Sequence, residues 1–313
     1  MTTTDIHGVD PHADLRFYEE GGWTIVPLTG TFGAELSGQH LSEADPNLVR
    51  ELLERHLFLR FRNQWLTHAQ QSSLAHGMGE PTPAHPVLPG HPDFPEILEL
   101  NGALGGKNAM WHTDVTFVPS PPAISILVND HTPTAGGDTI WSDTRTAYDR
   151  LHPALRAALE ELTAVHRVTP LAYWGEPFDT AFSREDAYAL HENALKMKSV
   201  EHPVVRVHPV TGRKNLFVNP GFTQHLNGPS RIESTHLLSL LYAHMTQPEF
   251  VVRHFWQPGD VAMWDNRATM HYAVDDYGAA ERRLRRITLR GDLPFGPQGF
   301  VSRLVEDPLV AIR

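Results

Sequence analysis

The chain has 313 residues, no cysteine and a formal net charge of −11 at pH 7. The lack of cysteine excludes disulfides, thiolate zinc sites, iron–sulfur clusters and cysteine nucleophiles. The negative charge argues against nucleic acid or an anionic membrane surface as a partner, because both favour clustered positive charge.

The first 20 residues form a polar, acidic leader without the basic and apolar regions of a signal peptide. No apolar run approaches the roughly 20 residues that span a bilayer. We therefore predict a cytoplasmic protein with no membrane association, whose residues 21–313 form a single domain.

The first third of the chain predicts strands, two helices and a long loop. Pro46, directly after the N-cap residue Asp45, marks the start of the first helix. In chain order the expected elements are a strand at 23–28, the helix that follows Asp45, a strand at 57–61, a helix at about 68–78 and an extended loop at 79–95 with six prolines. This loop is either a surface connection or a wall of a pocket.

The rest of the chain is richer in strands. Ser230 and Glu233 have the spacing of a capping box at the start of one helix. The predicted elements are strands at 96–100, 111–117, 123–129 and 138–143, a helical region at 144–167, a candidate lid at 173–202, a hairpin at 203–219, a helix at 231–246, and strands at 250–256, 261–264 and 284–292. Many short strands with few helices predict a double-sheet β architecture with flanking helices.

The pattern His-x-Asp occurs three times, beginning at His12, His91 and His112. Side chains two apart on a strand share a face, so a strand can direct both at one metal. The first pair lies in the polar leader, and the second has a proline between its members. Only His112 and Asp114 lie in a predicted strand, which makes them the candidate metal ligands. The alternative on local pattern is a hydrogen-bonded pair in the core.

A third ligand is expected from "MWDNRATMHYAVDDY", where His271 lies near a strand, a turn and a tryptophan. Two histidines and one carboxylate on one face of a metal form the facial triad of non-haem Fe(II) oxygenases. The opposite positions of the metal remain open for small ligands.

Five arginines lie in the run "RRLRRITLR", residues 282–290. In a strand, Arg282 and Arg286 would point to one face, whereas Arg283 and Arg285 would point to the other. An exposed edge strand is one explanation. If the strand belongs to a core sheet, some guanidinium groups point into a pocket, where they would hold a carboxylate or sulfonate through paired hydrogen bonds.

Several segments resemble the taurine dioxygenase family of Fe(II)- and 2-oxoglutarate-dependent enzymes, in the superfamily that includes 2,4-dichlorophenoxyacetate dioxygenase. The matching segments, in the family's order, are "WHTDVTF", "GGDTIW", "VNPGF", "WDNRATMHYAVDDY" and the arginines that follow. The resemblance runs from about residue 20 to residue 295. It implies a mainly β fold with flanking helices, a double-stranded β-helix of the jelly-roll, cupin-like type.

The resemblance also implies roles for particular residues. His112, Asp114 and His271 match the iron ligands of the family. Thr139 and Arg282 match the pair that holds the far carboxylate of the co-substrate 2-oxoglutarate. Fe(II), 2-oxoglutarate and O₂ are therefore the expected cofactor and co-substrates.

The substrate pocket is expected from the same resemblance. Arg286 matches the arginine that binds the sulfonate, and His85, Asn108 and Phe222 match further pocket positions. Leu88 departs from the pattern, because the taurine enzymes carry tyrosine there. An aliphatic side chain makes this wall less polar and favours a longer or more apolar substrate, whereas Asn108 suits a substrate amine.

The implied reaction hydroxylates the carbon next to the sulfonate of taurine or a related alkyl sulfonate and releases sulfite and an aldehyde, with succinate and CO₂. Alkyl sulfate esters and small carboxylates are alternative substrates, since an arginine accepts all three anions. A catalytically silent cupin-like binding protein and a nucleic-acid demethylase are rival functions, and the acidity of the chain disfavours the second. The relatives lead us to expect a homo-oligomer, either a dimer or a tetramer.

Overall fold

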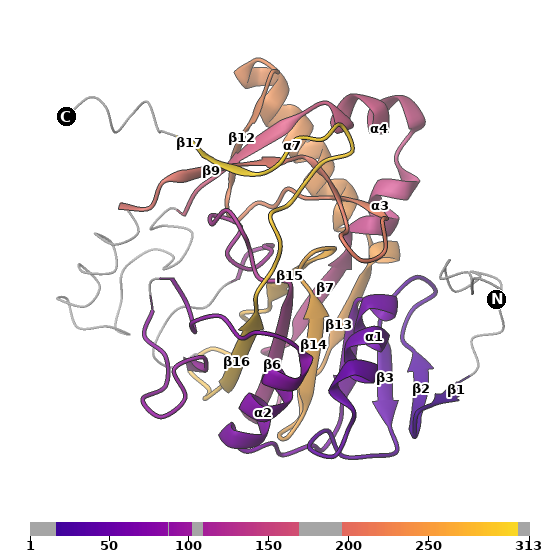
Figure 1. Ribbon diagram of the computed structural model, residues 1–313, viewed down its shortest axis with the longest axis vertical. Helices are drawn as coiled ribbons and strands as arrows, with labels where there is room; N and C mark the ends of the chain where they lie inside the picture. The colour runs from indigo at the N-terminus through magenta and orange to yellow at the C-terminus, as the bar shows by residue number, and fades with distance from the viewer. Residues whose placement is uncertain (1–16, 87, 102–108, 169–195, 306–313) are drawn as a thin grey trace.

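The computed structural model describes residues 17–86, 88–101, 109–168 and 196–305. Two β-sheets face each other in the lower part of Figure 1, and helices cover the outer face of the larger one. The predicted jelly roll with flanking helices is confirmed. Within the described ranges, no helix is long and apolar enough to cross a membrane.

The larger sheet has eight strands, and its neighbours are antiparallel except for one parallel pair, β3 and β4. Across the sheet the order is β1 (Tyr18–Glu20), β2 (Trp23–Pro27), β3 (Ala34–Ser37), β4 (Phe58–Phe61), β14 (Val261–Asp265), β6 (Ile124–His131), β16 (Arg283–Leu289) and β5 (Leu98–Asn101). Strand β1 lies within the segment that the sequence predicts as a polar leader.

The smaller sheet has the order β13 (Val251–His254), β7 (Thr139–Asp143) and β15 (Thr269–Ala273), all antiparallel. Side chains of both sheets meet between them, and the ring centroids of Trp141 and Trp264 lie 5.5 Å apart. This inner layer contains the core around the functional site.

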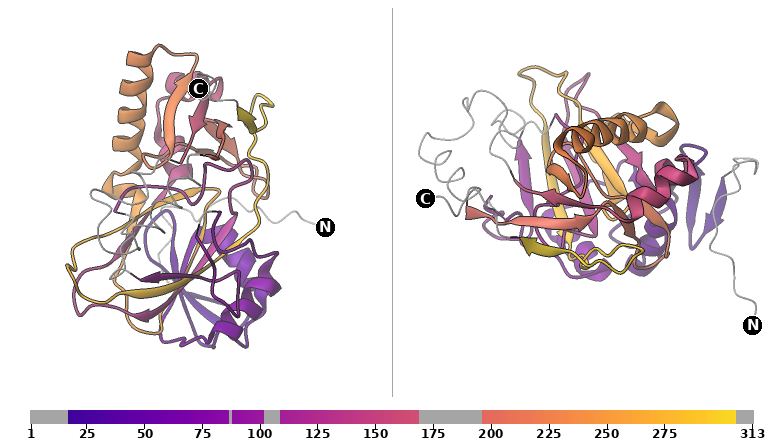
Figure 2. Two further views of the ribbon diagram at one scale, coloured as in Figure 1. Left: turned by 90° about the vertical axis from the view of Figure 1, so that its left-hand side faces the viewer. Right: turned by 90° about the horizontal axis from the view of Figure 1, so that it is seen from above.

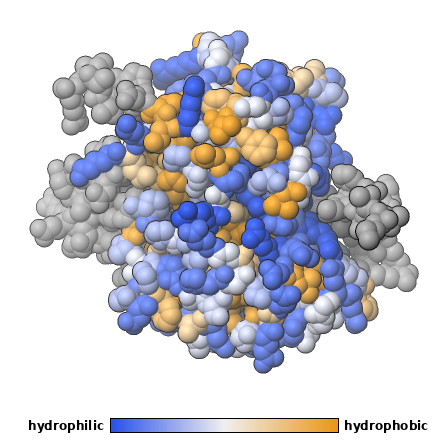
Figure 3. Space-filling view, viewed as in Figure 1, coloured by the Kyte–Doolittle hydropathy of each residue, from blue (hydrophilic) through white to orange (hydrophobic). Residues whose placement is uncertain are grey.

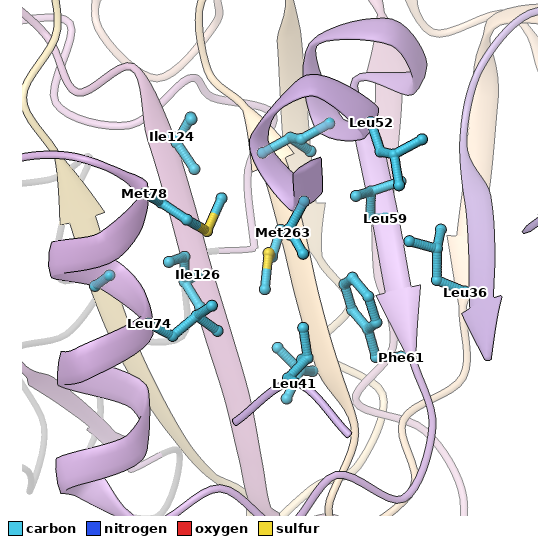
Figure 4. Packing of buried hydrophobic residues seen from close by; sticks show 14 of the residues in the cluster. Leu36, Leu41, Leu52, Leu59, Phe61, Leu74, Met78, Ile124, Ile126 and Met263 are labelled. Atoms are coloured by element: carbon cyan, nitrogen blue, oxygen red, sulfur yellow. The ribbon is translucent and has the colours of Figure 1, made fainter. Parts of the chain in front are cut away.

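The outer face of the larger sheet is covered by α1 (Pro46–His56) and α2 (His68–Met78). Asp45 caps α1 as predicted, since its carboxylate accepts the backbone N–H of Asn47. Figure 4 shows side chains of α2, such as Leu74, directed at the strands beneath them. Alternation along β6 explains the layering, because Ile126 faces the helices and Leu127 faces the smaller sheet.

A second group of elements lies above the two sheets in Figure 1. It contains a four-stranded sheet in the order β12 (Thr223–Asn227), β8 (Thr163–His166), β9 (Ser199–Pro203) and β17 (Arg303–Val305). A hairpin of β10 (Val205–Val207) and β11 (Lys214–Leu216) lies in the same group. The helices of the group are α3 (Thr144–Arg150), α4 (Pro153–Glu160), α7 (Arg231–Met245) and the short 3-10 helix η2 (Pro248–Phe250). Figure 2 shows α7 as the long helix of this group, and it contacts β12. The predicted hairpin and the predicted capping box of α7 are confirmed.

Two predictions of local structure are wrong. The region 111–117 is a single bridge followed by turns, because its backbone reverses after Asp114 and does not continue along a ladder. The region 144–167 is not helical throughout, since its end forms strand β8, which pairs with β12 and β9.

The candidate lid at 173–202 lies largely outside the described residues, which resume at 196. The described end of this segment includes most of β9, a strand inside the four-stranded sheet.

The face shown in Figure 3 is mostly hydrophilic, with apolar residues gathered in its upper half. The exposed Leu293, Val301 and Leu304 come from the segment that contains β17.

Candidate active site

Three predicted ligands meet between the two sheets, and we call His112, Asp114 and His271 the inner triad. One ligand atom from each lies within 4.8 Å of the others. The Oδ1 atom of Asp114 is 4.0 Å from His112 Nε2 and 3.9 Å from His271 Nε2. All three side chains are buried. This donor set and spacing fit one metal ion with open positions.

The main chain holds the two histidines side by side. The backbone N–H of His112 donates to the carbonyl of His271 at 2.9 Å, and the N–H of His271 donates to the carbonyl of His112 at 2.7 Å. His271 lies in the middle of strand β15, which pairs with β7. The reciprocal bonds therefore make His112 a one-residue extension of the smaller sheet.

A turn, and not strand alternation, directs Asp114 at the histidines. Val115 has a φ of +55°, a backbone conformation that a β-branched residue rarely adopts. Thr116 then faces away from the triad, where its hydroxyl lies 3.0 Å from His166 and 3.1 Å from the amide of Asn219. The predicted alternation of a strand therefore does not continue past Asp114.

The larger sheet supplies the partners of the carboxylate. Ser125 on β6 donates its hydroxyl to Asp114 Oδ2 at 2.7 Å, and Arg286 on β16 donates to Oδ1. Burial by itself would raise the pKa of Asp114, but the Arg286 guanidinium and the two histidines hold this pKa well below its usual range. The ligand is therefore ionised at any physiological pH.

The histidines of the triad are neutral. Burial lowers the pKa of His112, and burial and the neighbouring imidazole lower the pKa of His271 well below its ordinary value. His112 Nδ1 lies 2.9 Å from the carbonyl of Met110, so Nδ1 carries the proton and Nε2 offers its lone pair towards Asp114. This is the arrangement expected of a metal-ligating imidazole.

The predicted co-substrate pair also comes together. Arg282 donates to the Thr139 hydroxyl at 3.3 Å and to the carbonyl of Gly137 at 2.8 Å. Gly137 has a φ of +72°, and a Cβ atom there would lie 3.0 Å from Arg282. A glycine thus makes room for the guanidinium. Burial lowers the pKa of Arg282, but an arginine remains charged.

Register places this pair beside the triad. On β7, Thr139 and Trp141 point to the same face because they are two residues apart. Trp141 is the ladder partner of His271, and its ring stacks on the imidazole with centroids 6.4 Å apart. Thr139 therefore lies one pleat, roughly 7 Å, along the strand from the partner of a triad histidine.

Two of the predicted substrate residues, Phe222 and His85, lie near the triad. The Phe222 ring lies 5.0 Å from Phe117 and 6.2 Å from His112, measured between centroids. His85 is buried, and its Nδ1 accepts the backbone N–H of Leu88 at 3.2 Å. Burial, with Arg286 nearby, lowers the pKa of His85 to about 3, so the ring is neutral with its proton on Nε2. The proline-rich loop thus brings His85 close to Arg286 and Asp114.

Asn108, the remaining predicted substrate residue, lies outside the described residues. The arginine run forms β16, a strand inside the larger sheet, so its alternate side chains point to opposite faces of that sheet. Arg286 faces inward to Asp114, whereas Arg285 faces α2 and pairs with Asp130 at 2.7 Å. The exposed-edge explanation is wrong for both of these arginines, which are buried.

Two residues next to the triad, Ser125 and Asn266, were not predicted from the sequence. Asn266 donates its amide to the Ser125 hydroxyl at 2.7 Å and accepts the indole N–H of Trp264 at 2.9 Å. A signal for Ser125 existed, since it is the lone hydroxyl in the apolar run "AISILV". Its position beside Asp114 required the tertiary fold.

A second group of possible ligands lies on the outside, and we call His68, His91 and Glu99 the outer cluster. Its ligand atoms also lie within 4.8 Å of one another. The Glu99 side chain is 60% exposed, and His91 Nδ1 accepts the backbone N–H of Asp93. The His-x-Asp pair at 91 and 93 therefore does not ligate as a pair. A partly exposed group of this kind fits a metal less well than the inner triad does.

A jelly roll with a His-Asp-His triad between its sheets is the arrangement of non-haem Fe(II) oxygenases. Comparison with known proteins agrees with this class. The sequence profile described as "Taurine catabolism dioxygenase TauD, TfdA family" matches residues 24–288. The chain is 40% identical over 290 residues to the alpha-ketoglutarate-dependent sulfate ester dioxygenase of Pseudomonas putida, covering 89% of this chain and 93% of that protein.

Two further proteins show the same relationship. The chain is 41% identical over 287 residues to the alkylsulfatase of Acinetobacter baylyi, covering 88% of this chain and 87% of that protein. The crystal structure of a taurine dioxygenase from Burkholderia xenovorans superposes with a TM-score of 0.76 at 37% identity, covering 91% of this chain and 97% of that chain. The chain belongs to the TauD/TfdA family and is an Fe(II)- and 2-oxoglutarate-dependent dioxygenase, alpha-ketoglutarate being another name for 2-oxoglutarate.

Proposed function

We propose that the protein hydroxylates the carbon that bears the sulfate group of an alkyl sulfate ester. O₂ is the oxidant: one of its oxygen atoms enters the substrate as the hydroxyl group and the other enters succinate as 2-oxoglutarate loses CO₂. The hydroxylated product is a hemiacetal sulfate, which then collapses to an aldehyde and hydrogen sulfate. The observation that carries the proposal is the buried guanidinium of Arg286, which contacts Asp114 of the inner triad. A buried apolar cluster that contains Phe117 and Phe222 supports it, since Phe222 also lies against His112.

In this proposal the inner triad holds Fe(II), and Arg282 with Thr139 holds the far carboxylate of 2-oxoglutarate. The bound metal and co-substrate supply the oxidising chemistry. The buried, charged Arg282 forks onto a carboxylate, and the Thr139 hydroxyl can donate to the same group. The residues of the chain bind and orient, and their burial excludes water from the reacting carbon.

Arg286 and His85 fix the position of the substrate. An anion on the Arg286 guanidinium lies next to a triad ligand, so the carbon attached to that anion lies near the metal. His85 is buried and neutral, and the charges of Arg286 and Asp114 both act on its pKa, so this ring lies beside the proposed anion position. The electrostatic attraction of Arg286 suits a sulfate or sulfonate head group.

The apolar wall favours an alkyl chain over an amine. Phe117 and Phe222 belong to one buried apolar cluster, and Leu88 replaces the family's tyrosine in the same loop as His85. A buried wall of this kind binds methylene groups through apolar burial, about 0.8 kcal/mol for each CH₂. The two relatives named for sulfate esters, at 40% and 41% identity, support the same substrate class.

The second candidate substrate is an alkyl sulfonate such as taurine. The taurine dioxygenase structure at 37% identity supports it, and Asn108 retains the family's polar position. A sulfonate binds Arg286 as a sulfate does. Hydroxylation would then release sulfite instead of sulfate.

A matched substrate panel separates the two. Alkyl sulfates and alkyl sulfonates of equal chain length, taurine and the corresponding carboxylates would be assayed for succinate, with sulfate and sulfite measured separately. We expect sulfate release from alkyl sulfates with the highest kcat/KM. Sulfite release from taurine at a higher kcat/KM would establish the second candidate. No substrate-stimulated succinate from either class would contradict both.

A further inference from the structure

Asp114 has two carboxylate oxygens, and its neighbours treat them differently. Oδ2 accepts the hydroxyl of Ser125 at 2.7 Å. Oδ1 faces both triad histidines at 3.9–4.0 Å and also accepts from Arg286. Since an ionised carboxylate oxygen has about two lone-pair directions, Oδ1 can accept from Arg286 and bind a metal at the same time.

A chain of hydrogen bonds with only one possible direction ends on Oδ2. The indole nitrogen of Trp264 is a donor only, so the Asn266 atom 2.9 Å from it must be the amide oxygen. The amide NH₂ of Asn266 therefore points at the Ser125 hydroxyl, 2.7 Å away. A hydroxyl that accepts there has its single hydrogen left for Asp114. The backbone N–H of Asp114 also lies 3.4 Å from the Asn266 oxygen.

Burial makes this direction fixed. Trp264 and Asn266 are 1% exposed, Ser125 is 0% exposed and Asp114 is 2% exposed. Bulk water therefore does not compete for these donors, and a buried polar network of this type is rigid when every member is satisfied. Ser125 and Trp264 are ladder partners on β6 and β14, so two adjacent strands of the larger sheet set the network's geometry.

We propose that Ser125 and Asn266 are positioning residues that reserve Oδ2 and leave Oδ1 as the single metal-ligating oxygen of Asp114. A carboxylate bound through one oxygen occupies one coordination position, whereas a bidentate carboxylate occupies two. The network thereby keeps a position available for a small ligand. This inference rests on the proposed function, in which the inner triad holds the metal.

The test measures metal binding in the full chain without substrate. Ser125→Ala and Asn266→Leu are compared with the wild type by anaerobic Co(II) titration, which gives the dissociation constant and the d–d absorption bands. Ser142→Ala is the matched control, since Ser142 is also a fully buried strand serine, and its hydroxyl donates to the carbonyl of Met245. Thermal melts of the metal-free proteins report any general loss of stability.

We expect Ser125→Ala to weaken Co(II) binding by about 10- to 100-fold, the range for outer partners of metal ligands. The d–d bands should also shift, because a freed Oδ2 can take the coordination position that a small ligand holds in the wild type. Asn266→Leu should act in the same direction. The double variant should bind no worse than the weaker single variant, since both act through one oxygen. Ser142→Ala should match the wild type in affinity and spectrum.

Wild-type affinity and spectrum in Ser125→Ala would overturn the inference, as would an equal loss in Ser142→Ala. Either result with a metal-binding wild type leaves the proposed function intact. A wild type that binds no Co(II) would overturn both.

Discussion

The inner triad and the outer cluster both have a ligand spacing that suits a metal ion. Each brings three ligating side chains within 4.8 Å. They differ in what surrounds the carboxylate: Asp114 is 2% exposed with a hydroxyl on one oxygen and a guanidinium on the other, whereas Glu99 is 60% exposed. Proximity is common among surface histidines and acids, but fixed, desolvated and directed ligands are not. The support around a ligand therefore identifies a metal site better than ligand spacing does.

The largest difference in metal affinity between the inner triad and the outer cluster should appear when the carboxylate of each is removed. Asp114→Ala is expected to weaken Mn(II) or Co(II) binding by more than about 1,000-fold, about 4 kcal/mol, because it deletes the negative ligand of a buried site. Glu99→Ala should leave the tight site unchanged. Isothermal titration under anaerobic conditions measures both. Tight binding that survives in Asp114→Ala and disappears in Glu99→Ala would reverse the comparison.

The ion pairs of the two groups should differ in stability as well. Arg286→Met leaves Asp114 charged, buried and without its guanidinium, and should lower the free energy of unfolding of the metal-free protein by about 3–5 kcal/mol. Urea denaturation should show partial recovery with Mn(II), since the metal restores a positive charge. Glu99→Gln, which removes an exposed partner of His68, should stay within about 0.5 kcal/mol. A loss below about 1 kcal/mol in Arg286→Met would contradict the assigned role of burial.

The cost of burying an imidazole can be measured away from the triad. Burial lowers the pKa of His202 to about 3, and its Nε2 lies 2.8 Å from the carbonyl of Thr116, behind the turn that carries Asp114. The unfolded histidine, with a pKa of about 6.5, binds a proton that the folded one does not, so stability is complete above about pH 6.5 and falls as the pH decreases towards 3.

In the wild type, protonation of the unfolded His202 should lower the free energy of unfolding by about 1.4 kcal/mol for each pH unit between pH 6 and 5. His202→Gln lacks this imidazole, so its free energy of unfolding should fall less steeply by that amount. The measurement is urea denaturation at both pH values. Ser142→Ala, which changes a buried hydroxyl and no imidazole, should keep the slope of the wild type. An unchanged slope in His202→Gln would show that this histidine is not buried neutral.

The smallest effect concerns the loop at 79–95, which carries the proposed substrate residues His85 and Leu88 and also His91 of the outer cluster. Leu88→Tyr restores the family's phenol and should shift the ratio of kcat/KM for taurine over an alkyl sulfate by about 10-fold towards taurine. Ile232→Tyr on exposed α7 is the control. Equal ratios in the wild type and Leu88→Tyr would exclude this residue from substrate choice.

Much of the fold could be predicted from local signals. The caps of α1 and α7 depend on residues that are adjacent in sequence, and the strands of the larger sheet are short apolar runs between turns. Strand β8 and the turn after His112 could not be predicted in the same way, because tertiary contacts determine them. Val115 keeps its positive φ only because the surrounding structure holds Asp114 and Thr116 on both sides of it.

The candidate site shows the same limit. The resemblance to a family supplied the inner triad, Thr139, Arg282 and the pocket residues with their numbers. Strand alternation selected His112 and Asp114, which the structure brings together with His271, but the backbone that does so is a turn and not a strand. Ser125 was missed because it is 11 residues from Asp114 in sequence and comes from the opposite sheet. Partners that act across a barrel leave little trace in a local pattern.

The reciprocal main-chain bonds between His112 and His271 have one more consequence. Main-chain hydrogen bonds hold these two histidines in place, and the shared metal ion is not needed for that. The site therefore keeps its fold when the ion is removed. We expect loading and unloading to be local and repeatable, with manganese or cobalt able to enter the same place as inert replacements. The activity of such an enzyme would then follow the iron supply of its surroundings without new protein synthesis.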